Sequence, residues 1–362
     1  LSVVIDDLGI YYDATRPSRL EVVLNGDADA NNGQDLPAPI DKIYNHYTGD
    51  PLEDAPLLAR ARHCIASITE SSLSKYNNSP AVTLPATDRP RVLVVDQTAG
   101  DLSIACGLAD AASFRQMLEA ALTEHPQAEI LVKVHPDVVA GKKRGHLLEA
   151  GSNPRVRLLD KAINPVSLIR QVAHVYVVTS LTGFEALMLG KAVTCFGVPF
   201  YAGWGLTDDR VNVPRRIRQR SLEQVFAAAY LLYARYRDPE SGAACEIERV
   251  IDHLALQRHW FNRNAGDLYC YGFSLWKRGY ARGYLRCPWN RIHFIRTPWR
   301  LARHHSADTA RLVVWGVREP AWLKALAKVR EIPVWRVEDG FLRSVGLGSD
   351  LTAPASWVCL LY

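Results

Sequence analysis

Short apolar runs alternate with amphipathic segments through the middle of the chain. Apolar runs typical of buried strands cover residues 92–95, 130–134, 156–159, 175–178 and 192–196. Helical periodicity covers residues 54–73, 111–124, 165–172, 184–189 and 221–260. A strand–helix–strand pattern recurs at 311–315, 320–329 and 334–337. Strands that alternate with helices predict an α/β fold of Rossmann-type parallel sheet lobes, here with a helical extension after the first lobe.

The composition fits a folded chain with more than one domain. The 362 residues exceed the size of one ordinary domain, and 48% of them are hydrophobic. The seven cysteines show no CxxC spacing, which favours a reducing, cytoplasmic compartment and gives no metal site. Walker A, HExxH, Gly-x-Ser-x-Gly and a GxGxxG after a strand are all absent from the sequence. Triphosphate hydrolysis, nicotinamide chemistry and zinc hydrolysis are therefore disfavoured.

The segment 175–209 has the pattern of a ligand-binding turn. Its first strand ends on two hydroxyls, Thr179 and Ser180, and Gly183 precedes a helical run. Hydroxyls and free N–H groups at the start of a helix bind phosphate in open α/β sheets. The loop 200–209 that follows is polar and aromatic, and we interpret it as a wall of the site.

Further side chains suited to chemistry follow other strands. His135 and Pro136 come directly after the strand at 130–134, and Pro136 forces an extended turn that points His135 out of the strand end. Ligands bind beyond the carboxyl ends of parallel strands, where Asp96, His135 and Thr179 are all expected. Such a histidine binds phosphate, protonates a leaving group, or caps its own loop. The neighbouring hydroxyls favour the functional alternatives.

Three acidic residues each have a structural and a functional interpretation. Glu185 follows Thr182 by three residues, which fits a capping box, or else its carboxylate accepts hydrogen bonds from ribose. Asp101 lies in a polar loop and is either a turn residue or a nucleophile or base. Glu338 precedes an aspartate and a glycine, which suits an acid/base site, although so short a motif is a weak signal.

A basic, tryptophan-rich stretch separates the two predicted α/β units. Between residues 258 and 303, ten Lys and Arg residues face a single acid, Asp267. The stretch either binds an anionic membrane surface, an acidic glycan or RNA, or it is a helical connector whose tryptophans pack inward. Among the binding alternatives, a membrane surface is favoured over nucleic acid.

Several motifs together carry a family resemblance. They are EDGFLRS at 338–344, IDDLGIYYDATRPS at 5–18, KVHPD at 133–137, TSLTGFEALMLGK at 179–191 and CFGVPFYAGWGLT at 195–207. With them the chain closely resembles the capsular polysaccharide β-Kdo glycosyltransferases. Those enzymes of Gram-negative bacteria build an oligo-Kdo linker on a phosphatidylglycerol-type lipid before capsule export. The resemblance covers nearly the whole chain and implies a GT-B-like fold with two related modules in tandem.

The resemblance also implies roles for single residues. It implies retaining transfer of β-Kdo from CMP-Kdo by double displacement, with no cofactor or metal. Asp101 matches the nucleophile and Glu338 the general acid/base. Positions that match the nucleotide-sugar site are His135, Pro136, Thr179, Ser180, Gly183 and Glu185. Of these, His135, Thr179 and Ser180 match contacts to the CMP phosphate, and Glu185 matches the ribose contact.

The order of the motifs is rotated relative to the family, which predicts a fragment. Residues 1–85 are expected to be the remainder of the amino-terminal lobe of a first module, and 90–255 its nucleotide-sugar-binding lobe with closing helices. The basic stretch, 256–304, is then an inter-module linker, and 305–362 is the truncated start of a second module. Glu338 belongs to that second module, so the acid/base residue of the first is expected before Leu1.

The resemblance implies partners and a location as well. We expect CMP-Kdo, the lipid-linked Kdo acceptor, the inner-membrane surface and capsule biosynthesis or export proteins as partners, and no nucleic acid. The expected location is the cytoplasm, peripheral to the inner membrane. The alternative function is that of a non-catalytic, membrane-peripheral component of capsule export or assembly. Transfer of Kdo to a synthetic lipid acceptor distinguishes the two.

Overall fold

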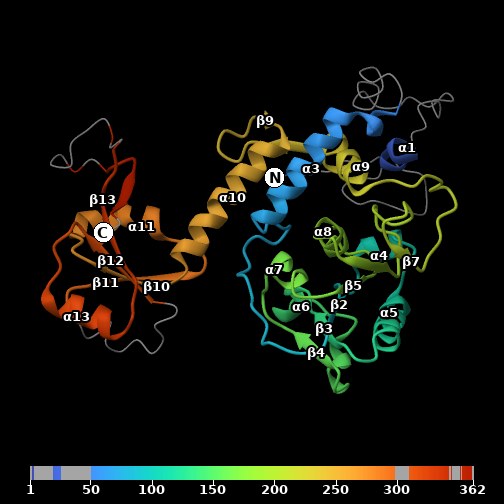
Figure 1. Cartoon of the computed structure of the whole chain (residues 1–362), viewed down its shortest axis with the longest axis horizontal. Helices are drawn as coiled ribbons and strands as arrows, with labels where there is room; N and C mark the ends of the chain where they lie inside the picture. Colours follow the sequence, from blue (N-terminus) through green and yellow to red (C-terminus); the bar gives the residue numbers. More distant parts are fainter. Residues whose placement is uncertain are drawn as a thin grey trace. The chain divides into compact units, whose positions relative to one another are not determined.

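The structure is a computed structural model of the chain. It describes residues 2–3, 19–25, 50–297, 310–341, 344, 351 and 353–360. The motif at 5–18, part of EDGFLRS and the end of the basic stretch lie outside the described residues. The chain divides into two compact units, Leu1–Leu256 and Gln257–Tyr362, which Figure 1 colours from blue to yellow and from yellow to red.

The first unit is built on a parallel six-stranded sheet. Its spatial order is β4 (Val156–Leu159), β3 (Glu129–Lys133), β2 (Arg91–Val95), β5 (His174–Val177), β6 (Ala192–Cys195) and β7 (Asp208–Asp209). The chain thus runs outward from β2 to one edge, returns to β5 and runs to the other edge. This is the doubly wound order, and ligands bind where it reverses, between β2 and β5.

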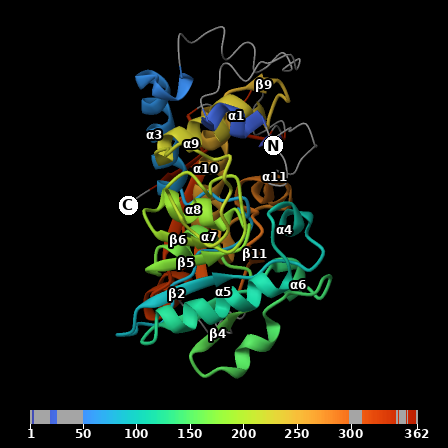
Figure 2. The same cartoon turned by 90° about the vertical axis from the view of Figure 1, so that its right-hand side faces the viewer.

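Helices cover both faces of this sheet because its strands are apolar on both sides. The covering elements are α4 (Leu102–Cys106), α5 (Ala111–Glu124), α6 (Pro136–Val139), the 3-10 helix η2 (Leu148–Ser152), α7 (Pro165–Ile169) and α8 (Thr182–Met188). Leu93 and Leu131 pack with Phe184 of α8, whereas Val94 packs with Phe114 of α5 on the other face. Figure 2 shows α5 and α8 on opposite sides of the strands.

A helical layer and a small antiparallel sheet complete the first unit. The helices are α1 (Arg19–Asn25), the 3-10 helix η1 (Pro51–Glu53), α3 (Ala55–Glu70), α9 (Leu222–Phe226), the π-helix η3 (Ala227–Tyr233) and the first part of α10 (Ile247–Asn264), whose residues from Gln257 belong to the second unit. The strands are β1 (Ser2–Val3), β8 (Arg235–Arg237) and β9 (Ala244–Cys245). The continuous helical region expected at 221–260 is therefore wrong. The hairpin β8–β9 interrupts it because Gly242, with φ of +71°, allows a tight turn there.

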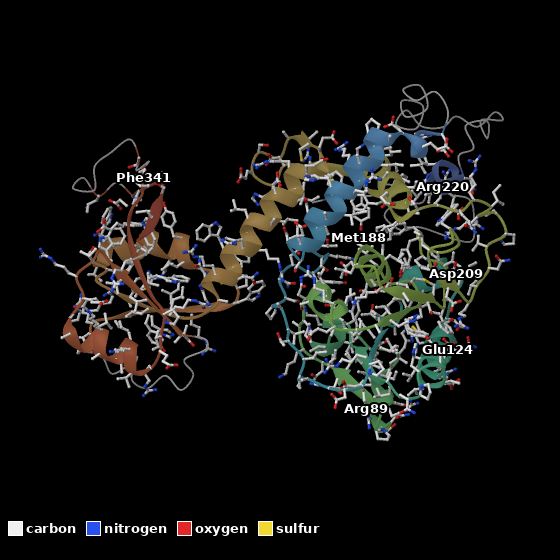
Figure 3. The ribbon with its side chains drawn as sticks, in the orientation of Figure 1. Arg89, Glu124, Met188, Asp209, Arg220 and Phe341 are labelled. Carbon is white, nitrogen blue, oxygen red and sulfur yellow. The ribbon has the colours of Figure 1, made fainter. Side chains whose placement is uncertain are left out.

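Buried ion pairs fasten α1 to the loop that precedes α9. Both oxygens of the Glu21 carboxylate accept hydrogen bonds, from Arg215 at 2.8 Å and from Arg216 at 2.7 Å. Arg220, which Figure 3 labels beside α1, donates to Asp50 at 2.6 Å. Such buried pairs need both partners, so this arrangement fixes where α1 lies in the unit.

The aromatic loop at 200–209 is part of the core, so the expectation that it forms a wall of the site is wrong. Tyr201 and Trp204 are fully buried and pack in the same cluster as Phe184. The indole N–H of Trp204 donates to the Phe200 carbonyl at 2.8 Å. The Tyr201 hydroxyl donates to the Ser180 carbonyl. Aromatic side chains with satisfied polar atoms are favourable core residues, which explains the difference.

The second unit is a five-stranded sheet with two described helices. Its spatial order is β11 (Asn290–Ile295), β10 (Gly266–Tyr271), β12 (Ala310–Trp315), β13 (Val334–Asp339) and β14 (Trp357–Leu360). Only β14 is antiparallel to its neighbour. The described helices are α11 (Leu275–Leu285) and α13 (Ala321–Val329).

The basic stretch, for which the sequence left a binding role and a helical connector open, supplies β10, α11 and β11 of this unit, so it is not a purely helical connector. Leu268 and Cys270 of β10 are buried in a core that also holds Leu285 of α11. In the sequence, the many arginines between these apolar residues obscure the pattern of a buried core. The guanidinium groups of Arg278 and Arg282 each lie 5.1 Å from the centre of the Phe294 ring, so these charged side chains pack against an aromatic residue of the sheet. Among the described residues, no helix has the length and apolarity needed to cross a membrane.

Candidate ligand-binding site

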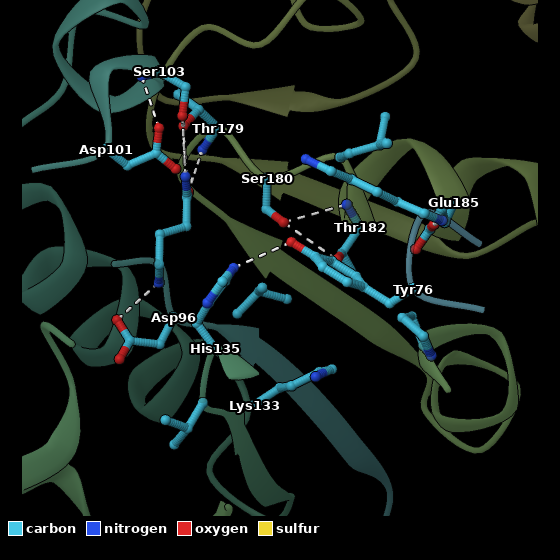
Figure 4. Close-up of a pocket in the computed structure, with 16 residues that line it drawn as sticks. Tyr76, Asp96, Asp101, Ser103, Lys133, His135, Thr179, Ser180, Thr182 and Glu185 are labelled. Carbon is cyan, nitrogen blue, oxygen red and sulfur yellow. Dashed lines mark hydrogen bonds between the residues drawn. The ribbon is translucent and has the colours of Figure 1, made fainter. Parts of the chain in front are cut away.

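A polar pocket lies at the carboxyl edge of the first sheet, where β3, β2 and β5 end side by side (Figure 4). Its lining residues come from several loops and strand ends. They are Lys75, Tyr76, Val95, Asp96, Gln97, Asp101, Ser103, Lys133, Val134, His135, Pro165, Thr179, Ser180, Leu181, Thr182 and Glu185. The pocket is therefore at the point where the strand order reverses, as expected for a doubly wound sheet.

Gln97 bridges the two strands at this point. Its amide nitrogen donates to the Thr179 hydroxyl at 3.0 Å, and its amide oxygen accepts from the Thr179 backbone N–H at 3.0 Å. The Ser103 hydroxyl lies 3.2 Å from that of Thr179. The backbone and the side chain of Thr179 thus both form hydrogen bonds that hold the loop after β2 in place.

The two aspartates after β2 have different surroundings. Asp96 is buried, and its carboxylate accepts from the backbone N–H groups of Gln97, His146 and Leu147. Burial raises the pKa of Asp96, although the three donors counteract it. Asp101 caps α4, since its Oδ1 accepts from the Ser103 N–H at 3.0 Å. Its Oδ2 accepts no hydrogen bond from the described residues. Asp101 is therefore the carboxylate that is open to a ligand.

His135 is held by two hydrogen bonds. Its Nδ1 accepts from the Asp137 N–H at 3.2 Å, and its Nε2 lies 3.1 Å from the Tyr76 hydroxyl. Because Nδ1 accepts, the neutral ring carries its hydrogen on Nε2. Burial lowers the pKa of His135, which favours this neutral form. The histidine both caps its own loop and presents a neutral N–H to the pocket, and Pro136 begins the short helix α6 beside it.

The turn after β5 differs from the capping box that the sequence suggests. The N-cap of α8 is Leu181, whose side chain makes no cap, and Thr182 is already helical. The Ser180 hydroxyl donates to the Thr182 hydroxyl at 3.2 Å. The capping-box interpretation of Glu185 is therefore wrong, because the helix begins one residue earlier than a cap at Thr182 requires.

Glu185 instead binds the loop that follows α3. Its Oε1 accepts from the Ser74 hydroxyl at 2.7 Å and from the Lys75 N–H at 3.2 Å. The side chain is buried, and burial raises the pKa of Glu185. With the contact between Tyr76 and His135, this carboxylate draws the Ser74–Tyr76 segment into the pocket.

The structure brings most of the sequence-predicted residues together. Asp101, His135, Thr179, Ser180 and Glu185 all line the pocket. Glu338 is in the second unit, at the end of β13. Sequence reasoning did not assign Tyr76 or Lys133 to the site. Lys133 lies in KVHPD, one of the motifs that carry the resemblance, and this was the available signal for it. Among the described residues, no group of three or more His, Cys, Asp or Glu side chains is arranged to hold a metal ion.

Gly183 packs closely against the core of the first unit. A Cβ at this position would lie 2.2 Å from the hydroxyl of the fully buried Tyr201. We expect Gly183→Ala to lower the free energy of unfolding by about 1–3 kcal/mol, because the core must shift to admit the methyl group. Urea denaturation followed by fluorescence measures this. Gly279→Ala in α11, where a Cβ meets no atom within 4 Å, is the control and should not destabilise. Equal midpoints for Gly183→Ala and the wild type would contradict the packing role.

The fold and the pocket define a doubly wound α/β protein with a polar ligand site at the reversal of strand order. Residues 1–236 match the family described as capsule polysaccharide biosynthesis protein, and the chain belongs to this family. It is 44% identical to the capsule polysaccharide modification protein LipA of Neisseria meningitidis serogroup B, over 99% of this chain and 49% of LipA. It is 40% identical to the lipopolysaccharide-processing protein LpsZ of Rhizobium meliloti, over 74% of this chain and 56% of LpsZ. The chain thus spans about half the length of these relatives.

Two solved structures are similar. The first, described as the β-Kdo 2,4 transferase of Thermosulfurimonas dismutans KpsC, has a TM-score of 0.59 and 44% identity, covering 70% of this chain and 72% of that one. The second, the β-Kdo 2,7 transferase of the same KpsC, has a TM-score of 0.51 and 31% identity, covering 71% and 72%. The α/β, GT-B-like fold class predicted from the sequence is confirmed by the parallel sheets and this match.

Proposed function

We propose that this chain carries the donor-binding part of a glycosyltransferase that moves β-Kdo from CMP-Kdo to a lipid-linked Kdo acceptor with retention of configuration. The observation that carries the proposal is the 44% identity, over 70% of the chain, to a structure described as a β-Kdo transferase. The pocket supports it, because a carboxylate with an open oxygen shares the pocket with a neutral histidine and two hydroxyls. Capsule polysaccharide biosynthesis is the context that the family provides.

In this proposal Asp101 is the nucleophile of a double displacement. Its carboxylate attacks the anomeric carbon of Kdo while the bond from that carbon to the CMP phosphate oxygen breaks, and CMP leaves with the electron pair. The acceptor hydroxyl then attacks the same carbon, the bond to Asp101 breaks, and the hydroxyl proton passes to a general base. Two inversions restore the β configuration. In the second unit, Glu338 has the acid/base role by its place in the EDGF motif.

The other site residues hold the donor. On binding, the Nε2–H of His135 exchanges its contact with the Tyr76 hydroxyl for the phosphate, and the Ser180 hydroxyl does the same with its bond to Thr182. Pro136 sets the turn that places His135. Thr179 supports Ser180 through Gln97, and Gly183 lets the turn pack on Tyr201. Glu185 binds the ribose through Oε2, because Oε1 is occupied by Ser74 and Lys75. No cofactor or metal takes part.

The location of the acceptor determines where in the cell such an enzyme acts. A phosphatidylglycerol-type lipid-linked Kdo acceptor lies in the inner membrane, so the protein acts at its cytoplasmic surface together with capsule biosynthesis and export proteins. Nucleic acid is not a partner. The basic residues of α11 and β11 have the charge that an anionic membrane surface attracts.

Incubation of the wild-type chain with CMP-Kdo tests the proposal. We expect binding of CMP in calorimetry, release of CMP faster than spontaneous hydrolysis, and a Kdo adduct on the peptide that contains Asp101, detected by mass spectrometry. CMP-sialic acid, which has the same nucleotide on a different sugar acid, is the control and should give no adduct. A chain that binds no CMP would contradict the proposal and favour the non-catalytic assembly component.

A further inference from the structure

Lys133 is a buried cation that the mechanism above does not use. It is the last residue of β3, and its side chain is on the same face of the sheet as Leu131, since side chains alternate along a strand. That face is covered by α7 and α8, so Lys133 is only 7% exposed. The alternation that buries Leu131 in the core therefore places an ammonium group at the edge of that core, in the wall of the pocket.

No described residue neutralises this ammonium. Among the described residues, the side chain of Lys133 makes no hydrogen bond, and no carboxylate oxygen lies within 4.0 Å of its ammonium nitrogen. Glu185 is the acid whose charge it senses, but the Oε1 of that carboxylate is already bound by Ser74 and Lys75. Figure 4 shows Lys133 extending toward the side of the pocket where Tyr76 and Glu185 lie.

A lysine in this position is costly to the folded protein. Burial without a partner disfavours the ammonium, which agrees with the lowered pKa of Lys133. An apolar residue of similar length would complete the face of β3 at lower cost. A charge kept under these conditions at the wall of a pocket is complementary to an anion that arrives with the ligand.

We propose that Lys133 is an anion subsite of the pocket, which binds one oxyanion of the ligand between Tyr76 and Glu185. The inference rests on the proposed function for the identity of that ligand. A sugar-acid nucleotide carries two oxyanions, its phosphate and the carboxylate of the sugar, and both have the charge and acceptor oxygens that an ammonium binds. The other donors in the pocket, His135 and Ser180, are neutral. Lys133 thus selects acidic ligands over neutral ones and holds the ligand, and it transfers no proton.

The experiment compares Lys133→Met with the wild type. Methionine has nearly the same volume and no charge, so the fold is kept. Lys191→Met is the matched control, since Lys191 precedes β6 at the amino ends of the strands, away from the pocket, and among the described residues its ammonium donates to the Arg170 carbonyl alone. Calorimetry with CMP, cytidine and free Kdo gives affinities, and CMP release gives KM for CMP-Kdo.

Two results support the inference and identify the oxyanion. If CMP affinity falls at least about tenfold while cytidine affinity is unchanged, Lys133 binds the phosphate. If CMP affinity is unchanged while free Kdo binds at least about tenfold more weakly and KM for CMP-Kdo rises, Lys133 binds the sugar carboxylate. In either case Lys133→Met should raise Tm, whereas replacing a structural lysine would lower it.

One result overturns the inference. If a folded Lys133→Met variant binds CMP, cytidine and free Kdo with affinities within about twofold of the wild type, Lys133 is not an anion subsite. Failure of the proposed function looks different, because the wild-type chain itself would then bind neither CMP nor Kdo.

Discussion

Replacing Asp101 with asparagine is expected to lower the rate of Kdo transfer at least about 10³-fold while leaving the affinity for CMP within about twofold. The asparagine side chain keeps an oxygen in the position of Oδ1, so it still accepts from the Ser103 N–H and caps α4. What it loses is the charged second oxygen, which is the nucleophile in the proposed mechanism. Measured CMP release and adduct formation should both disappear, and Tm should change little.

Asp110 provides a matched control for this experiment. It is also an aspartate that caps a helix, accepting from the Ala112 and Ser113 N–H groups, and it does not line the pocket that holds Asp101. Asp110→Asn should leave transfer unchanged. If Asp101→Asn retained more than about a tenth of the wild-type rate, Asp101 would be a cap only and the nucleophile would be another residue.

The sheet of the first unit was predictable because its strands carry local signals. The strands at 92–95, 130–134 and 156–159 and the helix at 111–124 all lie within about two residues of the observed elements. The predictions are wrong where a segment packs against residues that are distant in the sequence. The aromatic loop looked like a site wall because only the folded chain brings Tyr201 and Trp204 onto Phe184.

The site was predictable as far as strand ends reveal it. Asp101, His135, Thr179 and Ser180 follow strands that the apolar pattern identifies, so their convergence follows from a parallel sheet. The contact between Ser74 and Glu185 joins residues 111 positions apart, and no pattern in the sequence pairs them. Lys133 is at a position that strand alternation predicts to be buried, and its charge becomes informative only once the structure shows that no described residue neutralises it.

The role of Glu185 as an anchor can be measured as stability. We expect Glu185→Ala to lower the free energy of unfolding by about 2–4 kcal/mol, because it leaves the Ser74 hydroxyl and the Lys75 N–H without their acceptor and removes a carboxylate whose charge favours the ammonium of Lys133. Urea denaturation measures the change. Glu149→Ala, at an exposed site on η2, is the control and should stay within about 0.5 kcal/mol of the wild type.

Glu185→Gln separates the charge of this side chain from its hydrogen bonds. Burial raises the pKa of Glu185 above its ordinary value of 4.5, so the folded protein keeps a proton that the unfolded chain has already released. Stability of the wild type relative to Glu185→Gln must therefore fall as pH rises from about 4.5 to the raised pKa. A difference between the two proteins that stays constant across this range would show that Glu185 does not titrate with folding.

A double-mutant cycle then tests whether Glu185 compensates Lys133. In Glu185→Ala the buried ammonium loses the one carboxylate whose charge acts on it among the described residues, whereas in the double variant with Lys133→Met there is no ammonium for that charge to act on. We therefore expect the double variant to be more stable than Glu185→Ala alone, with a coupling free energy of about 1–3 kcal/mol. Additive effects within about 0.5 kcal/mol would contradict the coupling. The stability of the pocket and its capacity for an anion would then depend on independent residues.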